Sequence, residues 1–185
     1  LFFLLNTDLI FFFMSQTLKS IRIIKDFPKK GIAFYDISTI LSNPSKFHLV
    51  VNKMAKEVKK INADTIVGID SRGFIFASAV AFKLKKKACD DKKKRKASWQ
   101  NLFHKIQSRI SSQSIGSAKD MILKKDKVVI IDDIFATSGT IKASVNLVKR
   151  SKATITGIIV LLELSFLNGR SRIKEKLISL EKVNT

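Results

Sequence analysis

The chain has 185 residues, 45% of them hydrophobic, which is enough for one α/β domain with a buried core but too little for two full domains. Its 35 Lys and Arg against 15 Asp and Glu give a formal net charge of +20, which suggests polyanionic partners such as phosphates, nucleic acid or anionic lipid. A single cysteine excludes an intramolecular disulfide, and with two histidines in all the usual zinc ligand sets are excluded as well. The default expectation is a reducing, cytoplasmic setting.

The first thirteen residues, Leu1–Phe13, differ from the sequence that follows. Ten of them are apolar, but no basic region precedes them, Asp8 interrupts them, and they are too short to span a bilayer. We interpret residues 1–13 as an upstream or non-native extension ahead of a start at Met14; a membrane-associating end and a signal peptide are the alternatives. Residues 14–185 then form a single domain, for which no membrane partner is expected.

A second unusual stretch, Lys83–Arg109, holds eleven basic and two acidic residues and so supplies +9 of the net +20. It also contains the only cysteine and the only tryptophan. Its composition alone predicts a solvated or disordered basic loop, or a nucleic-acid-binding patch in which Trp99 and Phe103 stack on bases.

The rest of the chain alternates between strand and helix patterns. Asn43-Pro44 is typical of a helix start, and apolar residues follow at three- and four-residue spacing as far as Ile61. Further along the chain, the patterns predict a strand, a helix, a strand, a helix and a strand over Thr65–Ile69, Phe74–Val80, Val128–Ile131, Ile141–Val148 and Thr154–Leu162. We therefore expect an α/β fold with a central, mostly parallel sheet flanked by helices, in which ligands bind beyond the carboxyl ends of the strands.

The segment Asp132–Thr140 combines two carboxylates with a loop of small residues that opens a helix. Backbone N–H groups in such a loop form a concave anion site, to which the helix N-terminus and nearby hydroxyls contribute. The two carboxylates suit ribose hydroxyls, or a phosphate-bound magnesium reached through water. Because neither a Walker A loop nor a dinucleotide fingerprint is present, the segment predicts a different kind of phosphate cradle. The plain alternative is a capped helix after an acidic turn.

Asp132–Thr140 resembles the phosphoribosyl-pyrophosphate motif of the type I phosphoribosyltransferases. Three other segments, Asp26–Ile37, Gly68–Phe76 and Leu162–Arg170, are similar to the adenine phosphoribosyltransferases in particular. The four motifs occur in the right order and cover roughly Ile21 to Leu180 apart from one gap. The resemblance implies the type I phosphoribosyltransferase fold.

It also implies an enzyme of purine salvage, a glycosyltransferase that converts adenine and phosphoribosyl pyrophosphate to AMP and pyrophosphate. Magnesium would be bound mainly through phosphoribosyl pyrophosphate, without a direct protein ligand, and the protein would be a homodimer with no nucleic-acid partner. A non-catalytic binder of phosphoribosyl pyrophosphate or AMP, and another purine phosphoribosyltransferase, are the alternatives.

Carried over motif by motif, the family's site residues fall into four groups. Ala136, Thr137, Ser138, Gly139 and Thr140 would hold the 5′-phosphate, and Asp132 and Asp133 the ribose hydroxyls. Asp70, Ser71 and Arg72 would hold pyrophosphate, with a cis peptide between Asp70 and Ser71 as is usual in this family. Ala33, Phe34 and Tyr35 would line the adenine pocket, although the family usually has arginine at the position of Tyr35.

The flexible catalytic loop of this family, R-K-x-G-K-L-P-G-x-T followed by S-L-E-Y, should lie between Leu84 and Val128 but is absent as written. If the codons for Lys87 to Leu102 are each read from the second base, the degeneracy of the genetic code permits the sequence V-M-I-R-K-K-G-K-L-P-G-K-T-Y. The single codon for tryptophan forces a glycine at the position of Trp99. The same shift over Gln107–Ile110 permits S-L-E-Y. We hypothesise that residues 88–118 are a frameshift product.

As written, the chain lacks the loop's glutamate, and Arg109 stands at the corresponding codon. No catalytic residue can then be assigned. Since this loop closes over the substrates as a lid, we expect weak binding of phosphoribosyl pyrophosphate or AMP and little or no turnover.

Overall fold

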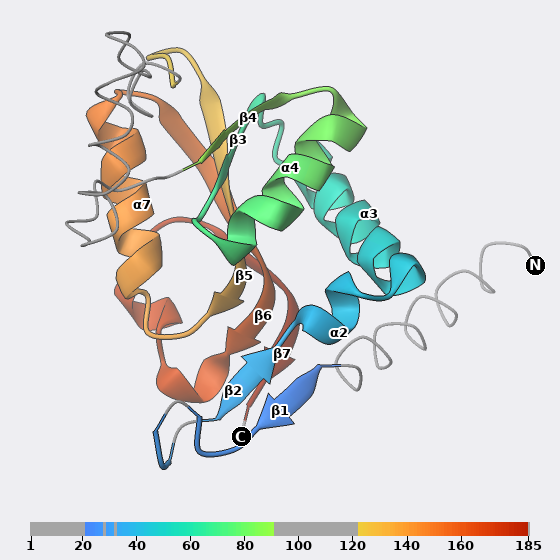
Figure 1. Ribbon diagram of the computed structural model, residues 1–185. Coiled ribbons are helices and arrows are strands. Elements are labelled where there is room, and N and C mark those ends of the chain that lie inside the picture. The colour runs from blue at the N-terminus through green and yellow to red at the C-terminus, as the bar shows by residue number, and fades with distance from the viewer. Residues whose placement is uncertain (1–20, 28, 32, 91–121, 185) are drawn as a thin grey trace, which may run out of the picture.

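The structure, a computed structural model, describes residues 21–27, 29–31, 33–90 and 122–184 (Figure 1). A five-stranded sheet in the order β4-β3-β5-β6-β7 forms its centre, and all neighbouring strands in it are parallel. These strands are β3 (Thr65–Gly68), β4 (Lys87–Asp90), β5 (Lys127–Phe135), β6 (Thr154–Leu164) and β7 (Leu177–Val183). A separate antiparallel pair is formed by β1 (Arg22–Ile24) and β2 (Phe34–Asp36). The expected α/β fold with a parallel central sheet is confirmed.

Helices cover both faces of the sheet (Figure 1). On one side lie α3 (Pro44–Lys60) and α4 (Arg72–Leu84), with the short α2 (Ser38–Leu41), and on the other lies α7 (Gly139–Arg150). Strand β5 serves both layers because successive side chains on a strand point to opposite faces. Val129 and Ile131 join the core beneath α3 and α4, whereas Val128 and Ile130 join the core beneath α7.

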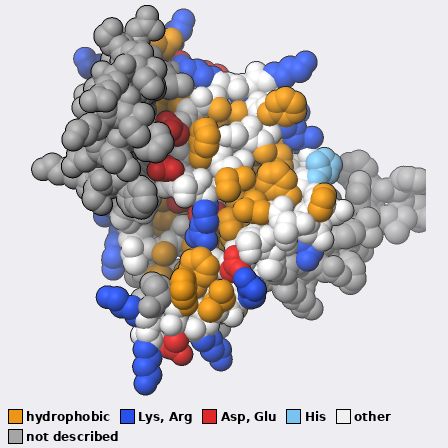
Figure 2. All heavy atoms as spheres, in the orientation of Figure 1, with side chains coloured by type: hydrophobic (Ala, Val, Ile, Leu, Met, Phe, Trp, Pro, Cys, Tyr) orange, Lys and Arg blue, Asp and Glu red, His pale blue; other side chains and the backbone are white. Residues whose placement is uncertain are grey.

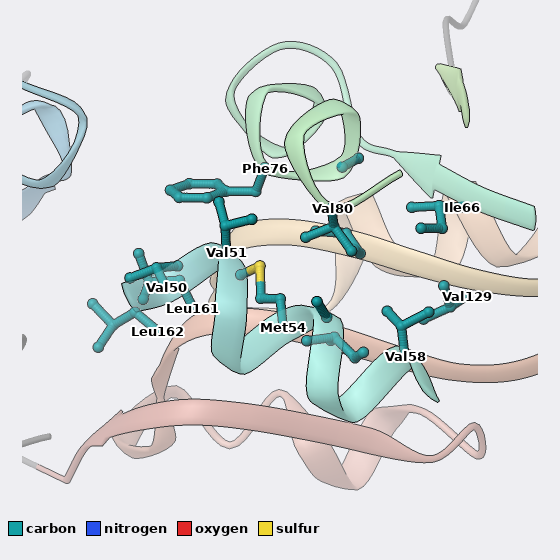
Figure 3. Close-up of a cluster of buried hydrophobic side chains, with 14 of the residues drawn as sticks. Val50, Val51, Met54, Val58, Ile66, Phe76, Val80, Val129, Leu161 and Leu162 are labelled. Atoms are coloured by element: carbon teal, nitrogen blue, oxygen red, sulfur yellow. The ribbon is translucent and has the colours of Figure 1, made fainter. Parts of the chain in front are cut away.

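Helix α3 shows how the local sequence produces this packing. The Asn43 side chain accepts a hydrogen bond from the backbone N–H of Lys46 at 3.0 Å, and Pro44 occupies the first helical position, as the sequence predicts. Apolar side chains at helical spacing then face α4 and the sheet, where Figure 3 shows Val50, Val51, Met54 and Val58 meeting Phe76, Val80, Ile66, Val129, Leu161 and Leu162. This core fixes the start of α4 relative to the ends of the strands.

Several elements differ from the sequence prediction. Strand β5 continues to Phe135, so Asp132 and Asp133 lie within it rather than after it. Strands β4 and β7 were not predicted, and the prediction of a solvated or disordered loop is wrong for residues 83–90, which complete α4 and form β4. Cys89 is buried in this strand. Ala88 and Cys89 pack into the cores on opposite faces of the sheet, and these contacts outweigh the basic surroundings of the strand.

Other sequence interpretations lie outside the described residues. These include the extension at residues 1–13 and most of the hypothesised frameshift, with Trp99, Phe103 and Arg109. Among the helices that are described, none has the length and apolar character needed to cross a membrane.

The β1–β2 hairpin is held by an ion pair at its base. Arg22 Nε donates to Asp36 Oδ2 at 3.0 Å, and Asp36 Oδ1 accepts the backbone N–H of Ser38 at 2.9 Å. The same carboxylate therefore fixes the end of β2 and the start of α2, and it positions the segment that carries Ala33 and Phe34.

This carboxylate predicts a pH dependence of stability. Hydrogen bonds from Ser38, followed by that from Arg22, lower the pKa of Asp36 from 3.8 to about 2. Its contribution to stability is then complete above pH 3.8 and is lost as the pH falls towards 2. The free energy of unfolding should differ between the parent chain and Asp36→Asn by a constant amount at higher pH, and the difference should shrink over this window. Urea denaturation at fixed ionic strength measures it, and a difference independent of pH would contradict the prediction.

Candidate active site at the carboxyl ends of the strands

The loop after β3 is built on close backbone packing. A Cβ at Gly68 would lie 2.6 Å from the Ala77 Cβ, so only glycine lets the strand approach α4 this closely. The peptide between Asp70 and Ser71 is cis, as the resemblance implies, and both residues are exposed. Arg72 begins α4 immediately afterwards. This loop therefore presents its backbone and the Arg72 side chain at the carboxyl edge of the sheet.

The loop after β5 has the form of an anion cradle. Ser138 is buried and adopts a left-handed conformation with φ of 75°, and α7 begins at Gly139. The N–H of Lys142 donates to the Ser138 carbonyl at 2.9 Å, so the N–H groups of Gly139 and Thr140 precede the first bond of the helix. Thr137, Gly139 and Thr140 are exposed. Hydroxyls, N–H groups and the positive end of a twelve-residue helix are thus available to one phosphate.

Two buried carboxylates stand beside this cradle. Asp132 and Asp133 are 6% and 5% exposed, and the Asp133 N–H donates to Asp132 Oδ1 at 2.9 Å. Gly73 brings α4 against them, because a Cβ there would lie 2.7 Å from Asp132 Oδ1 and 2.8 Å from the Ile131 carbonyl. The first turn of α4 is therefore in direct contact with β5 at Ile131 and Asp132.

Arg72 connects these carboxylates with the hairpin. Its Nε lies 2.8 Å from Asp133 Oδ2, and its guanidinium carbon lies 5.3 Å from the centre of the Phe34 ring. Phe27 packs edge-on against Phe34 at 5.3 Å between ring centres. A cation over an aromatic face is favourable, and a guanidinium also stacks well on planar rings. Arg72 thus joins an acidic corner to a half-buried aromatic surface.

The structure brings most of the predicted site residues to one edge but separates one side chain from the rest. Phe34 faces Arg72 and Ala33 is exposed beside it, whereas Tyr35 is 6% exposed and belongs to the hydrophobic core. The alternation of a strand explains this, because neighbouring residues point to opposite faces. An adenine contact at Tyr35 would have to come from its backbone.

Sequence reasoning missed one buried polar cluster near the site. Glu163 at the end of β6 is 3% exposed and accepts hydrogen bonds from Arg170 at 2.8 and 2.6 Å and from Ser179 Oγ at 2.5 Å. The pKa of Glu163 is lowered, mainly by the hydrogen bond from Arg170. Both charged residues lie in the segment Leu162–Arg170, but they are seven residues apart along an irregular stretch, and such a spacing predicts no contact.

The described residues contain no candidate metal site. Among them, no three His, Cys, Asp or Glu side chains lie close enough together to hold a metal ion. The carboxylates of Asp132 and Asp133 are the acidic groups beside the phosphate cradle, and Asp133 is already paired with Arg72.

The fold and the site define a phosphoribosyltransferase. Residues 36–183 match the family model described as "Phosphoribosyl transferase domain". The chain is 43% identical over 169 residues to the adenine phosphoribosyltransferase of Mycoplasma mobile, covering 91% of this chain and 98% of that relative. It is 38% identical to the enzyme of the same name from Pseudothermotoga lettingae, covering 86% and 94% of the two chains.

Solved structures of adenine phosphoribosyltransferases resemble this chain in fold. The adenine phosphoribosyltransferase of Thermoanaerobacter pseudethanolicus superposes with a TM-score of 0.77 at 32% identity, over 92% of this chain and 99% of that one. The enzyme of Giardia lamblia, solved with 9-deazaadenine, gives a TM-score of 0.76 at 27% identity, over 93% and 98%. The chain belongs to the adenine phosphoribosyltransferase family. The expected family, fold and class of enzyme, a transferase, are confirmed.

Proposed function

We propose that the chain's substrates are adenine and phosphoribosyl pyrophosphate and its products AMP and pyrophosphate, a reaction of purine salvage. The observation that carries this proposal is the position of Arg72, between Asp133 on one side and the Phe34 ring on the other. A nucleotide has a phosphate, a ribose and a base in a row. The phosphate cradle, the acidic corner and the aromatic surface offer a partner for each, in the same order.

Each group has a physical task in this reaction. The N–H groups and hydroxyls of Ala136–Thr140 hold the 5′-phosphate, and Asp132 and Asp133 accept hydrogen bonds from the ribose hydroxyls. As pyrophosphate departs, positive charge develops on the ribose as in glycoside cleavage, and the two buried carboxylates stabilise it. The Asp70–Ser71 loop and Arg72 face the departing pyrophosphate. Phe34 and Ala33 hold the flat base against the ribose carbon.

We propose that magnesium enters as an ion carried by the substrate. Such an ion usually keeps several waters and binds to phosphates and one or two carboxylates, and Asp132 and Asp133 are the carboxylates that would meet its water shell. When bound, it would neutralise charge on the pyrophosphate.

The base preference is tested by binding, which does not depend on turnover. We expect AMP to bind more tightly than IMP or GMP in calorimetric titrations of the chain. Tighter binding of IMP or GMP would favour another purine phosphoribosyltransferase. Binding of AMP without product formation, even after the catalytic loop is restored, would favour a non-catalytic binder.

We also propose that the protein is a homodimer in the cytoplasm. The single cysteine suits a reducing compartment. Helix α4 supports the dimer, because it exposes Phe74 at 38%, Ile75 at 41% and Phe82 at 88%. Phe74 and Phe82 are eight residues apart, which places them about 80° apart around the helix axis and within one apolar stripe. Figure 2 shows hydrophobic side chains gathered over the region of α4 and α3.

Exposed apolar patches of this kind mark interaction surfaces, so changing one should alter the oligomeric state. We expect sedimentation analysis to show a dimer for the parent chain and a monomer for Phe82→Asp. Phe166→Asp is the matched control, since Phe166 is 48% exposed but lies in the short helix η1 (Ser165–Leu167) rather than on α4. A monomeric parent chain, or a dimeric Phe82→Asp, would contradict the proposal.

A further inference from the structure

The motif Leu162–Arg170 has no part in the site as described so far, yet the structure ties it to the phosphate cradle. Arg170, in the short helix η2 (Arg170–Arg172), forms a two-point ion pair with Glu163, from Nε to Oε1 at 2.8 Å and from Nη2 to Oε2 at 2.6 Å. Its Nη1 donates to the Leu177 carbonyl at 3.0 Å and its Nη2 also reaches Ser179 Oγ at 3.1 Å. Arg170 therefore fastens the connecting segment to the end of β6 and to the first residues of β7.

The neighbouring residue, Gly169, presses on the cradle itself. A Cβ at Gly169 would lie 2.0 Å from the Ala136 carbonyl oxygen and 3.1 Å from Phe135 Cε1. No side chain fits at that distance, so the Gly169 backbone lies directly against the first residue of the phosphate loop. Figure 1 shows the segment between β6 and β7 beside the connection from β5 to α7. The register of the sheet also places the two segments side by side, since Phe135 at the end of β5 pairs with Glu163 in β6.

We propose that Glu163 and Arg170 are positioning residues for the 5′-phosphate: their ion pair holds Gly169 against Ala136 and so fixes the peptide groups of the cradle. The proposal rests on the proposed function, because it assumes that the cradle receives a phosphate. Thr137, Gly139 and Thr140 are exposed, and Ser138 has a left-handed backbone. A loop with three exposed residues has few contacts of its own and needs support from outside to keep its N–H groups converging on one point.

A purely structural role for the pair would give a different result. If Glu163 and Arg170 served only to attach β7, their loss would lower the melting temperature and weaken all ligands alike. If they position the cradle, their loss should weaken only those ligands that carry a 5′-phosphate. Comparing AMP with adenosine separates the two, because these ligands differ by the phosphate alone.

The variants are Arg170→Lys, which keeps the positive charge but loses the two-point geometry, and Gly169→Ala, which places a methyl group against Ala136. Glu175→Gln is the matched control. Glu175 lies in the same connection and forms an ion pair of 2.6 Å with Lys149, at the far end of α7 from the cradle. Calorimetric titrations with AMP and competition with adenosine are measured together with thermal unfolding.

Both test variants should bind AMP about 10- to 150-fold more weakly, the scale of one lost hydrogen bond to a charged group, with adenosine and the control unaffected. Unchanged AMP affinity in a folded Arg170→Lys or Gly169→Ala, or equal weakening of AMP and adenosine, would overturn the proposal. A parent chain that does not bind AMP would instead refute the proposed function.

Discussion

Replacing residues 88–118 by the translation of the same codons in the shifted frame is expected to raise AMP formation by about 10²-fold or more. The reason is chemical, since a positioned general acid–base group contributes about 10²- to 10⁴-fold to turnover and the chain as written lacks the glutamate of the family's loop. The family resemblance places a glutamate at the codon of Arg109. A lid that excludes water would add to the effect. The measurement is the initial rate with adenine, phosphoribosyl pyrophosphate and magnesium.

Two controls separate the loop's chemistry from its length. A flexible Gly/Ser segment of equal length should leave turnover at the low level of the parent chain. The restored loop with Arg109 kept in place should recover ligand binding but not turnover. Efficient AMP formation by the parent chain would contradict the prediction, and codons that fail to encode the loop in the shifted frame would contradict the frame hypothesis.

Asp133→Asn is expected to weaken binding of AMP and phosphoribosyl pyrophosphate by about 10- to 150-fold. The substitution removes a charged acceptor, and hydrogen bonds to charged groups contribute about 1.5–3 kcal/mol. It also loosens Arg72, whose Nε lies 2.8 Å from this carboxylate and whose guanidinium covers Phe34. Calorimetry on the folded variant measures the loss.

Asp126 provides a closely matched control, because it is a second buried aspartate and directly precedes the first residue of β5. Asp126 is 7% exposed and pairs with Lys87 at 2.7 Å, much as Asp133 is 5% exposed and pairs with Arg72. Asp126→Asn should therefore lower stability to a similar extent without affecting nucleotide binding. If both variants weakened AMP alike, Asp133 would act through stability and not through contact with ribose.

The sequence was sufficient to predict the elements whose apolar residues follow a clear period. Helix α3 and strands β3, β5 and β6 begin within one residue of their predicted starts, because burial selects their residues. Strand β4 was hidden by the lysines around it, and β7 by its mixed pattern, since neither the periodicity nor the composition of such short segments distinguishes a strand from a loop.

The candidate site was predictable in its composition but not in its internal contacts. The residue types of Asp132–Thr140 carry the chemistry of a phosphate cradle, and the parallel sheet brings the ends of β3 and β5 together. The pairing of Arg72 with Asp133, and that of Glu163 with Arg170, depends on how loops from different strands pack. The burial of Tyr35 depends on the strand register of β2, which was not predicted.

The net charge of +20 says less about the ligand once the contacts of the basic residues are known. Several basic residues in the described ranges are engaged with carboxylates, as Arg22, Arg72 and Arg170 are. Nine of the net charges belong to residues 83–109, most of which fall in the hypothesised frameshift. Net charge alone is therefore a weak guide to the ligand, whereas the strand-end geometry favours a single nucleotide.

Calorimetric titration of the chain with AMP, and separately with a short single-stranded nucleic acid, at two salt concentrations tests the central claim most directly. The site described above predicts saturable binding of one AMP per chain, with the nucleic acid unable to displace it. No binding of AMP, together with nucleic-acid binding that falls steeply as salt rises, would contradict the claim and assign the positive charge to a polyanion surface instead.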